Sequence, residues 1–143
     1  MVRVLATGTF DILHPGHLLY LSEAKALGDE LYVIVARDSM IKHKPKPIVP
    51  EGQRLAMVQA LRMVDKAMLG SEHDMFEPLR KICPDIIALG KNQFFNENEL
   101  ETQLKSHGIN AKVVRIQSFE KCELCSSAAI IRKILDRNGL HKS

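Results

Sequence analysis

Two histidines, His14 and His17, stand three residues apart at the start of a stretch whose apolar residues recur at helical spacing. Side chains three residues apart share a face of a helix, and here that face belongs to the first turn. The first turn carries unpaired N–H groups and the positive end of the helix dipole. Pro15 suits the first helical position, and Gly16 removes a Cβ where a ligand must come close. Two imidazoles beside free N–H groups suit an anionic, phosphate-like ligand.

An apolar run at Val2, Val4 and Leu5 precedes this turn and predicts a buried strand. Further strands are expected at residues 31–36, 66–69, 85–90 and 112–116. Helices are expected to begin at about residue 15 and to span residues 51–63, 75–82, 96–107 and 126–137. Strands that are apolar on consecutive residues and alternate with helices predict an α/β fold, a parallel five-stranded sheet with helices on both faces.

Three polar segments follow predicted strands, at residues 7–17, 90–93 and 117–127. In an open parallel sheet, ligands bind beyond the carboxyl ends of the strands, where the strand order switches. We therefore expect these three segments to converge on one active site.

The composition is that of an ordinary globular protein and predicts one domain over residues 1–143, with 45% hydrophobic and 26% charged residues. A net charge of +3 without a basic stripe interleaved with aromatic residues argues against nucleic acid as a partner. No apolar run reaches about 18 residues and no signal-peptide pattern is present, so we expect a cytoplasmic protein without a membrane partner. Three cysteines do not predict a disulfide framework.

The turn at residues 8–11, Gly-Thr-Phe-Asp, and the sequence His-Pro-Gly-His at residues 14–17 resemble the HxGH nucleotidylyltransferases in both motifs and in their separation. The resemblance implies a Rossmann-like, doubly wound sheet. It also implies attack by an acceptor oxygen on the α-phosphorus of a nucleoside triphosphate, with loss of pyrophosphate. In such a reaction the protein mainly positions the reactants and neutralises charge.

The resemblance assigns roles to individual residues. His14 and His17 would hydrogen-bond the triphosphate, and Thr9 and Phe10 would offer backbone N–H groups. Ser126 and Ser127 stand where the family holds the β- and γ-phosphates, although Ala128 replaces a third hydroxyl. The residues expected to bind the nucleotide are Thr9, Phe10, His14, Pro15, Gly16, His17, Asn92, Phe119, Ser126 and Ser127.

Lysines at positions 42, 44 and 46 lie in a proline-rich loop, which taken alone is a solvated basic loop. The family uses lysine from this region on the phosphates, so Lys44 is expected to be catalytic and Lys46 to bind phosphate. Residues 51–54 resemble the family's EQR signature, and Arg54 serves either packing or phosphate binding.

The nucleotide and the acceptor are predicted from the resemblance of short segments to particular families. Residues 120–126 lack the arginine and glycine of the cytidylyltransferase signature, which argues against CTP. Residues 35–38, 46–50 and 64–67 and the cysteine pair instead resemble the archaeal FAD synthases. That resemblance implies adenylyl transfer from ATP to FMN, giving FAD and pyrophosphate, with Mg²⁺ carried by the triphosphate, and homodimers are common among such relatives. A CTP-dependent glycerol-3-phosphate cytidylyltransferase and a non-catalytic nucleotide-binding or redox-sensing relative remain alternatives.

Cys122 and Cys125 are half of a zinc-site pattern, but no second pair with ligand spacing accompanies them. We therefore expect no protein metal site and interpret the two cysteines as a reduced, oxidisable pair near the active site.

Overall fold

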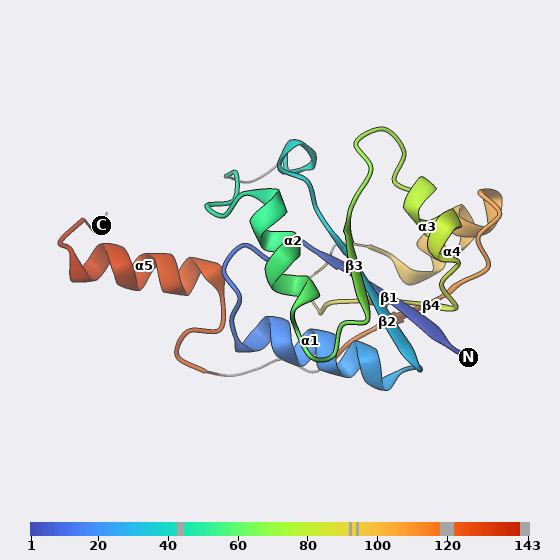
Figure 1. The fold of residues 1–143 in the computed structure, drawn as a ribbon, viewed down its shortest axis with the longest axis horizontal. Coiled ribbons are helices and arrows are strands. Elements are labelled where there is room, and N and C mark those ends of the chain that lie inside the picture. Colours follow the sequence, from blue (N-terminus) through green and yellow to red (C-terminus); the bar gives the residue numbers. More distant parts are fainter. Residues whose placement is uncertain (43–44, 92, 94, 118–121, 141–143) are drawn as a thin grey trace.

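The computed structural model describes residues 1–42, 45–91, 93, 95–117 and 122–140. Its centre is a five-stranded, all-parallel sheet in the order β3-β2-β1-β4-β5 (Figure 1). The strands are β1 (Arg3–Gly8), β2 (Glu30–Val35), β3 (Lys66–Leu69), β4 (Ile86–Leu89) and β5 (Lys112–Arg115). The helices are α1 (Pro15–Ala26), the 3₁₀ turn η1 (Asp38–Met40), α2 (Glu51–Gln59), α3 (Glu77–Ile82), α4 (Glu97–Ser106) and α5 (Ser127–Arg137).

The sheet is covered on both faces, as its uninterrupted apolar strands predict. Leu21 of α1 and Val58 of α2 pack against one face, in a cluster with Val4, Val33 and Ala88. On the other face, residues of α3 and α4 cover a second cluster, which contains Leu5, Leu79, Ile82, Ile87, Leu100 and Leu104. The predicted doubly wound, Rossmann-like fold is therefore confirmed.

Several boundaries differ from the prediction, for local reasons. The helix expected over residues 51–63 ends at Gln59, because the chain then turns to bring Lys66 into β3. Asn96 and Ser126 are caps and not helical residues, since their side chains accept the N–H of Glu99 and Ala129 respectively. The sequence did not predict η1.

Helix α5 is unlike the other α-helices of the described chain, because none of its residues is buried. It projects away from the sheet at the C-terminal end of the described chain (Figure 1). No helix in the described part of the chain is long and apolar enough to cross a membrane.

Candidate active site

The two histidines form the N-terminal cap of α1. His14 is the cap residue, and its Nδ1 accepts the Gly16 N–H at 3.1 Å. The His17 Nδ1 accepts the His14 N–H at 3.4 Å, so each imidazole satisfies a backbone donor of the same turn. Because both Nδ1 atoms accept, the neutral rings carry their proton on Nε2. Each histidine thus keeps one N–H donor for a ligand.

The rings of His14 and His17 are stacked, with centroids 3.7 Å apart. Burial lowers the pKa of His17 to about 4, and the neighbouring His14 contributes to this shift while Asp11 opposes it. Burial also lowers the pKa of His14. At neutral pH both rings are therefore uncharged hydrogen-bond donors, and the stacked pair does not repel itself.

Close contacts explain two glycines of the motif. A Cβ at Gly16 would lie 2.9 Å from the His14 ring and 3.2 Å from the backbone oxygen of Cys125. A Cβ at Gly8 would lie 2.8 Å from the ring of Phe10, whose φ of 54° is in the left-handed region. The backbone N–H groups of Thr9 and Phe10 have no acceptor in the described part of the chain. These are the two N–H groups that the family resemblance assigns to the nucleotide.

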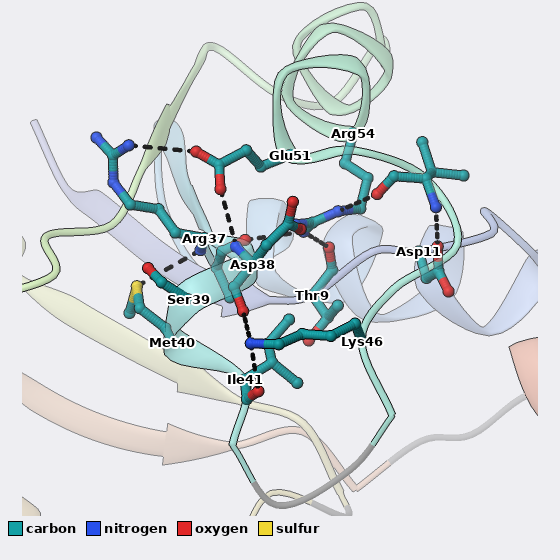
Figure 2. Close-up of polar contacts among 12 residues, drawn as sticks. Thr9, Asp11, Arg37, Asp38, Ser39, Met40, Ile41, Lys46, Glu51 and Arg54 are labelled. Carbon is teal, nitrogen blue, oxygen red and sulfur yellow. Dashed lines mark hydrogen bonds and ion pairs between the residues drawn. The ribbon is translucent and has the colours of Figure 1, made fainter.

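Arg54 is buried, and its guanidinium joins the turn after β1 to the segments that flank it (Figure 2). Its N–H groups donate to the carbonyl oxygens of Thr9 at 2.6 Å, Ala36 at 2.8 Å and Val49 at 2.8 Å. Nη2 also pairs with Asp38 at 2.6 Å. These bonds favour the packing role left open for Arg54 over phosphate binding.

Asp11 holds the end of the lysine loop (Figure 2). Its carboxylate accepts the N–H groups of Ile48 at 3.0 Å and Val49 at 2.9 Å. Within the same loop the Lys46 ammonium donates to the carbonyl oxygens of Asp38 at 2.7 Å and Ile41 at 3.1 Å. Lys46 is therefore bound to backbone oxygens, beside the turn that leads to the histidines.

The start of α5 also reaches the histidine turn. The Ser127 hydroxyl accepts the Ile12 N–H at 3.4 Å and lies 3.3 Å from the Ile12 carbonyl oxygen. Ser126 caps the helix through the Ala129 N–H at 3.0 Å. Two of the three predicted segments thus meet here, and the third meets them through Gln93, whose Nε2 lies 3.3 Å from the Thr7 hydroxyl oxygen.

Cys122 and Cys125 form a disulfide, so the expectation of a reduced pair was wrong for this structure. Their Cα atoms are 5.4 Å apart, a separation that a disulfide spans readily. The bond closes a short loop immediately before the cap of α5 and beside Gly16. Cys83 is a free, exposed cysteine.

A large apolar cavity of about 770 Å³ opens on the sheet face that carries α3 and α4. Thr7, Gly8 and Thr9 form part of its wall, so the turn before the histidines borders it directly. Leucine, isoleucine and methionine side chains form most of the rest. Its remaining lining residues are Leu5, Ile34, Ala36, Met40, Ile41, Lys42, Gly70, Ser71, Met75, Pro78, Leu79, Ile87, Leu89, Gln93, Phe95 and Leu100.

The sequence did not predict this cavity, because its lining comes from many segments and has no motif. Three of the expected site residues, Lys44, Asn92 and Phe119, lie outside the described residues. Among the residues described, no group of three or more His, Cys, Asp or Glu side chains is placed to hold a metal ion.

Comparisons with known proteins extend over nearly the whole chain. The model of the cytidylyltransferase-like family matches residues 5–133. The FAD synthase of Methanococcoides burtonii is 65% identical over 139 residues, which cover 97% of each chain. The FAD synthase of Archaeoglobus profundus is 60% identical, over 95% of this chain and 88% of its own. A solved structure of a lipopolysaccharide core biosynthesis protein from Thermoplasma volcanium is 50% identical, with a TM-score of 0.81 over 84% of this chain and 99% of that one.

Proposed function

Because this chain belongs to the cytidylyltransferase-like family, we propose that the site described above transfers the adenylyl group of ATP to FMN, giving FAD and pyrophosphate. Curated relatives at 65% and 60% identity over nearly the whole chain are FAD synthases, so the chain is an FAD synthase-type nucleotidyltransferase. The resemblance and the activity predicted from the sequence are thereby confirmed. The roles of individual residues remain our proposal.

One observation carries the assignment of substrates to the site. Residues Thr7, Gly8 and Thr9 form part of the wall of the apolar cavity. The chain that follows them leads to the histidine pair at the start of α1. A volume of about 770 Å³ is within the range that holds ligands of this size. We assign the triphosphate to the histidines and the flavin ring system, which is flat and largely apolar, to the cavity.

The histidines act on the triphosphate as neutral donors. Their Nε2–H groups, together with the N–H groups of Thr9 and Phe10, would bind the oxygens on which negative charge accumulates as pyrophosphate leaves. Donors that are already oriented cost no reorganisation at that moment, which is why such groups lower the barrier. Since the Nδ1 atoms are occupied by Gly16 and His14, the rings cannot turn away without losing those bonds.

Lys46 is proposed to exchange its carbonyl partners for phosphate oxygens when ATP binds. The gain is electrostatic, because an ammonium interacts more strongly with a triphosphate than with two neutral carbonyls. Asp11 and Arg54 keep the end of this loop fixed against the turn meanwhile. Lys44, which the family resemblance makes catalytic, belongs to the same loop.

FAD synthase nucleotidyltransferases generally use a divalent metal. We propose that Mg²⁺ enters with ATP as part of the substrate, held by phosphates and water. Mg²⁺ commonly keeps several waters and few protein ligands in such complexes. Asp11 is the carboxylate of the histidine turn, and both its oxygens already accept backbone N–H groups. Its bonds therefore serve the loop, which fits a metal held by phosphates and water.

The test is to incubate the protein with Mg²⁺ and each pairing of ATP or CTP with FMN or glycerol 3-phosphate. We expect FAD and an equal amount of pyrophosphate from ATP and FMN, resolved by chromatography. Product from CTP and glycerol 3-phosphate alone would instead support the cytidylyltransferase alternative. Nucleotide binding without any product would support the non-catalytic one.

A further inference from the structure

The pairing of β1 with β4 stops before either strand ends. The last paired residues are Ala6 and Ala88, although β1 runs on to Gly8 and β4 to Leu89. Gly8 faces β2, because its carbonyl oxygen accepts the Ala36 N–H at 2.9 Å. Thr7 therefore faces β4, since neighbouring residues of a strand point their backbone groups to opposite sides.

The same reasoning applies to β4. The Leu89 carbonyl oxygen accepts the Ile116 N–H at 2.8 Å, so Leu89 faces β5 and Gly90 faces β1. If the ladder continued in register, two further hydrogen bonds would follow, first from the Thr7 N–H to the Ala88 carbonyl oxygen and then from the Gly90 N–H to the Thr7 carbonyl oxygen. The Tyr20 hydroxyl takes the place of the first, since it accepts the Thr7 N–H and donates to the Ala88 carbonyl oxygen. The second is the bond between Gly90 and Thr7. This bond would close the sheet at the point where the cavity meets the turn.

The side-chain amide of Gln93 occupies the place of that bond. Its Oε1 accepts the Gly90 N–H at 2.7 Å. Its Nε2 lies 3.4 Å from the Thr7 carbonyl oxygen and 3.3 Å from the Thr7 hydroxyl oxygen. Both partners of the missing ladder bond are thus hydrogen-bonded to one carboxamide, which stands between the two strands.

Hydrogen bonds to the backbone of Gln93 hold its side-chain amide in place. The Gln93 N–H donates to the Gly90 carbonyl oxygen at 3.2 Å, and the Gln93 carbonyl oxygen accepts from Arg115 Nη1 at 2.8 Å. On the other face of the sheet, the buried Tyr20 hydroxyl donates to the Ala88 carbonyl oxygen at 2.6 Å and accepts the Thr7 N–H at 3.2 Å. Tyr20 thus holds Ala88 and Thr7 from the face that carries α1, and Arg115 holds the backbone of Gln93.

We infer that Gln93 is a positioning residue, whose carboxamide holds the ends of β1 and β4 apart beyond the point where the Tyr20 hydroxyl first separates them. It thereby sets the location of Thr7 and the turn that follows it, between the cavity and the histidines. Its kinetic consequence rests on the proposed adenylyl transfer, whereas its structural consequence does not. Displacing the turn would lower kcat more than it weakens ATP binding, because transfer depends on alignment to a fraction of an ångström.

Two substitutions of Gln93 distinguish the contribution of its hydrogen bonds from that of its size. Gln93→Met keeps the length of the side chain but removes the hydrogen bonds to Gly90 and to the two Thr7 oxygens, and we expect kcat to fall by about tenfold or more. Gln93→Glu keeps the shape and still accepts the Gly90 N–H, but its carboxylate cannot donate to the Thr7 carbonyl oxygen and repels it. Once protonated, that carboxyl group can donate to Thr7, so its activity relative to the parent should recover as the pH falls from 8 to about 5.

The control is Gln103→Glu, an exposed position on α4, which should follow the pH profile of the parent. Hydrogen exchange of the Gly90 amide, measured by NMR without substrates, gives a readout independent of activity and of folding assays. We expect it to change in Gln93→Met while amides of β2 and β3 keep their protection.

The inference is overturned if Gln93→Met keeps the kcat of the parent, or if Gln93→Glu shows no relative recovery at low pH. A parent protein that makes no FAD would refute the proposed function instead. In that case the Gly90 exchange still decides the matter, because unchanged exchange in Gln93→Met would show that the amide does not hold the strands.

Discussion

The two sides of the active site are built in different ways. The histidine side comprises the turn at residues 8–17 and the buried Arg54, and it is built from specific hydrogen bonds, within the turn, to the guanidinium and to the loop that Asp11 holds. The cavity side is lined by apolar residues from many segments of the chain. In the proposed function, the histidine side acts on the triphosphate through hydrogen-bond geometry, and the cavity side selects the acceptor through shape. Changes on the two sides should affect different measurable quantities.

The largest effect is expected from Arg54→Met. Removal of the buried guanidinium leaves three carbonyl oxygens without this donor and the half-exposed Asp38 carboxylate without its ion-pair partner. Loss of one partner from a buried polar network costs about 3–5 kcal/mol of unfolding free energy. Urea denaturation measures it, with Arg62→Met on the protein surface as a control. A loss below about 1 kcal/mol would mean that Arg54 does not hold the histidine side together.

The next largest effect is expected from His17→Ala, which removes a preorganised donor. We expect kcat to fall by about 10²–10³ while the free energy of unfolding changes far less. Steady-state FAD formation measures the loss, and His73→Ala in an exposed loop is the control. Near-parental kcat in both His14→Ala and His17→Ala would remove the histidines from the mechanism.

On the cavity side, Ala36→Leu would place extra methyl groups in the space assigned to the flavin. We expect KM for FMN to rise by about tenfold or more, with little change in ATP affinity, because a pocket discriminates by volume. Ala26→Leu, at the exposed end of α1, controls for added bulk. A rise in the dissociation constant for ATP of the same size would show that the two sides do not divide the substrates as assigned.

A smaller effect is expected for the preference of the enzyme for ATP over CTP. Since residues 120–126 lack the cytidylyltransferase signature, ATP should bind at least about tenfold more tightly than CTP, a difference of about 1.4 kcal/mol. Isothermal titration calorimetry with each nucleotide measures this difference. Equal affinities would mean that the histidine side recognises the triphosphate alone.

The smallest effect, a few-fold change, is expected from the thiol chemistry of Cys122 and Cys125. Their loop lies beside Gly16 and leads into α5, whose N-terminus contacts the histidine turn. We expect the reduced enzyme to be more active, and oxidation or alkylation to lower FAD formation, with a reductant reversing the oxidative loss. A Cys122→Ser/Cys125→Ser variant should be insensitive to oxidant. If it remains as sensitive as the parent, the exposed Cys83 is responsible.

The features predicted from the sequence are those that depend on neighbouring residues. The turn, Pro15, Gly16 and the paired histidines form one local pattern, so the start of the helix and the placement of the two rings beside each other were predicted from spacing, although the capping bonds of the rings were not. The alternation of apolar runs similarly predicted the sheet. The last helix was predicted to begin at Ser126, one residue before its start at Ser127, because a serine before an apolar helical run commonly caps the helix.

The features missed depend on contacts between distant residues. Gln93 and Thr7 are separated by 86 positions, and Asp11 and Val49 by 38, so no spacing rule joins them. Arg54 carries no local sign that it is buried, since arginine usually lies at the surface. The disulfide was missed because cysteine number and the expected compartment argued against it, although a separation of three residues permits the bond.

The shared wall at Thr7, Gly8 and Thr9 has a consequence for how such a protein can diverge. If the cavity binds the acceptor as proposed, substitutions there alter the acceptor without touching the hydrogen bonds of His14 and His17. A lineage with this architecture could thus explore new substrates by drift in side chains of the α3 and α4 face, while its chemistry stays under purifying selection in a short motif.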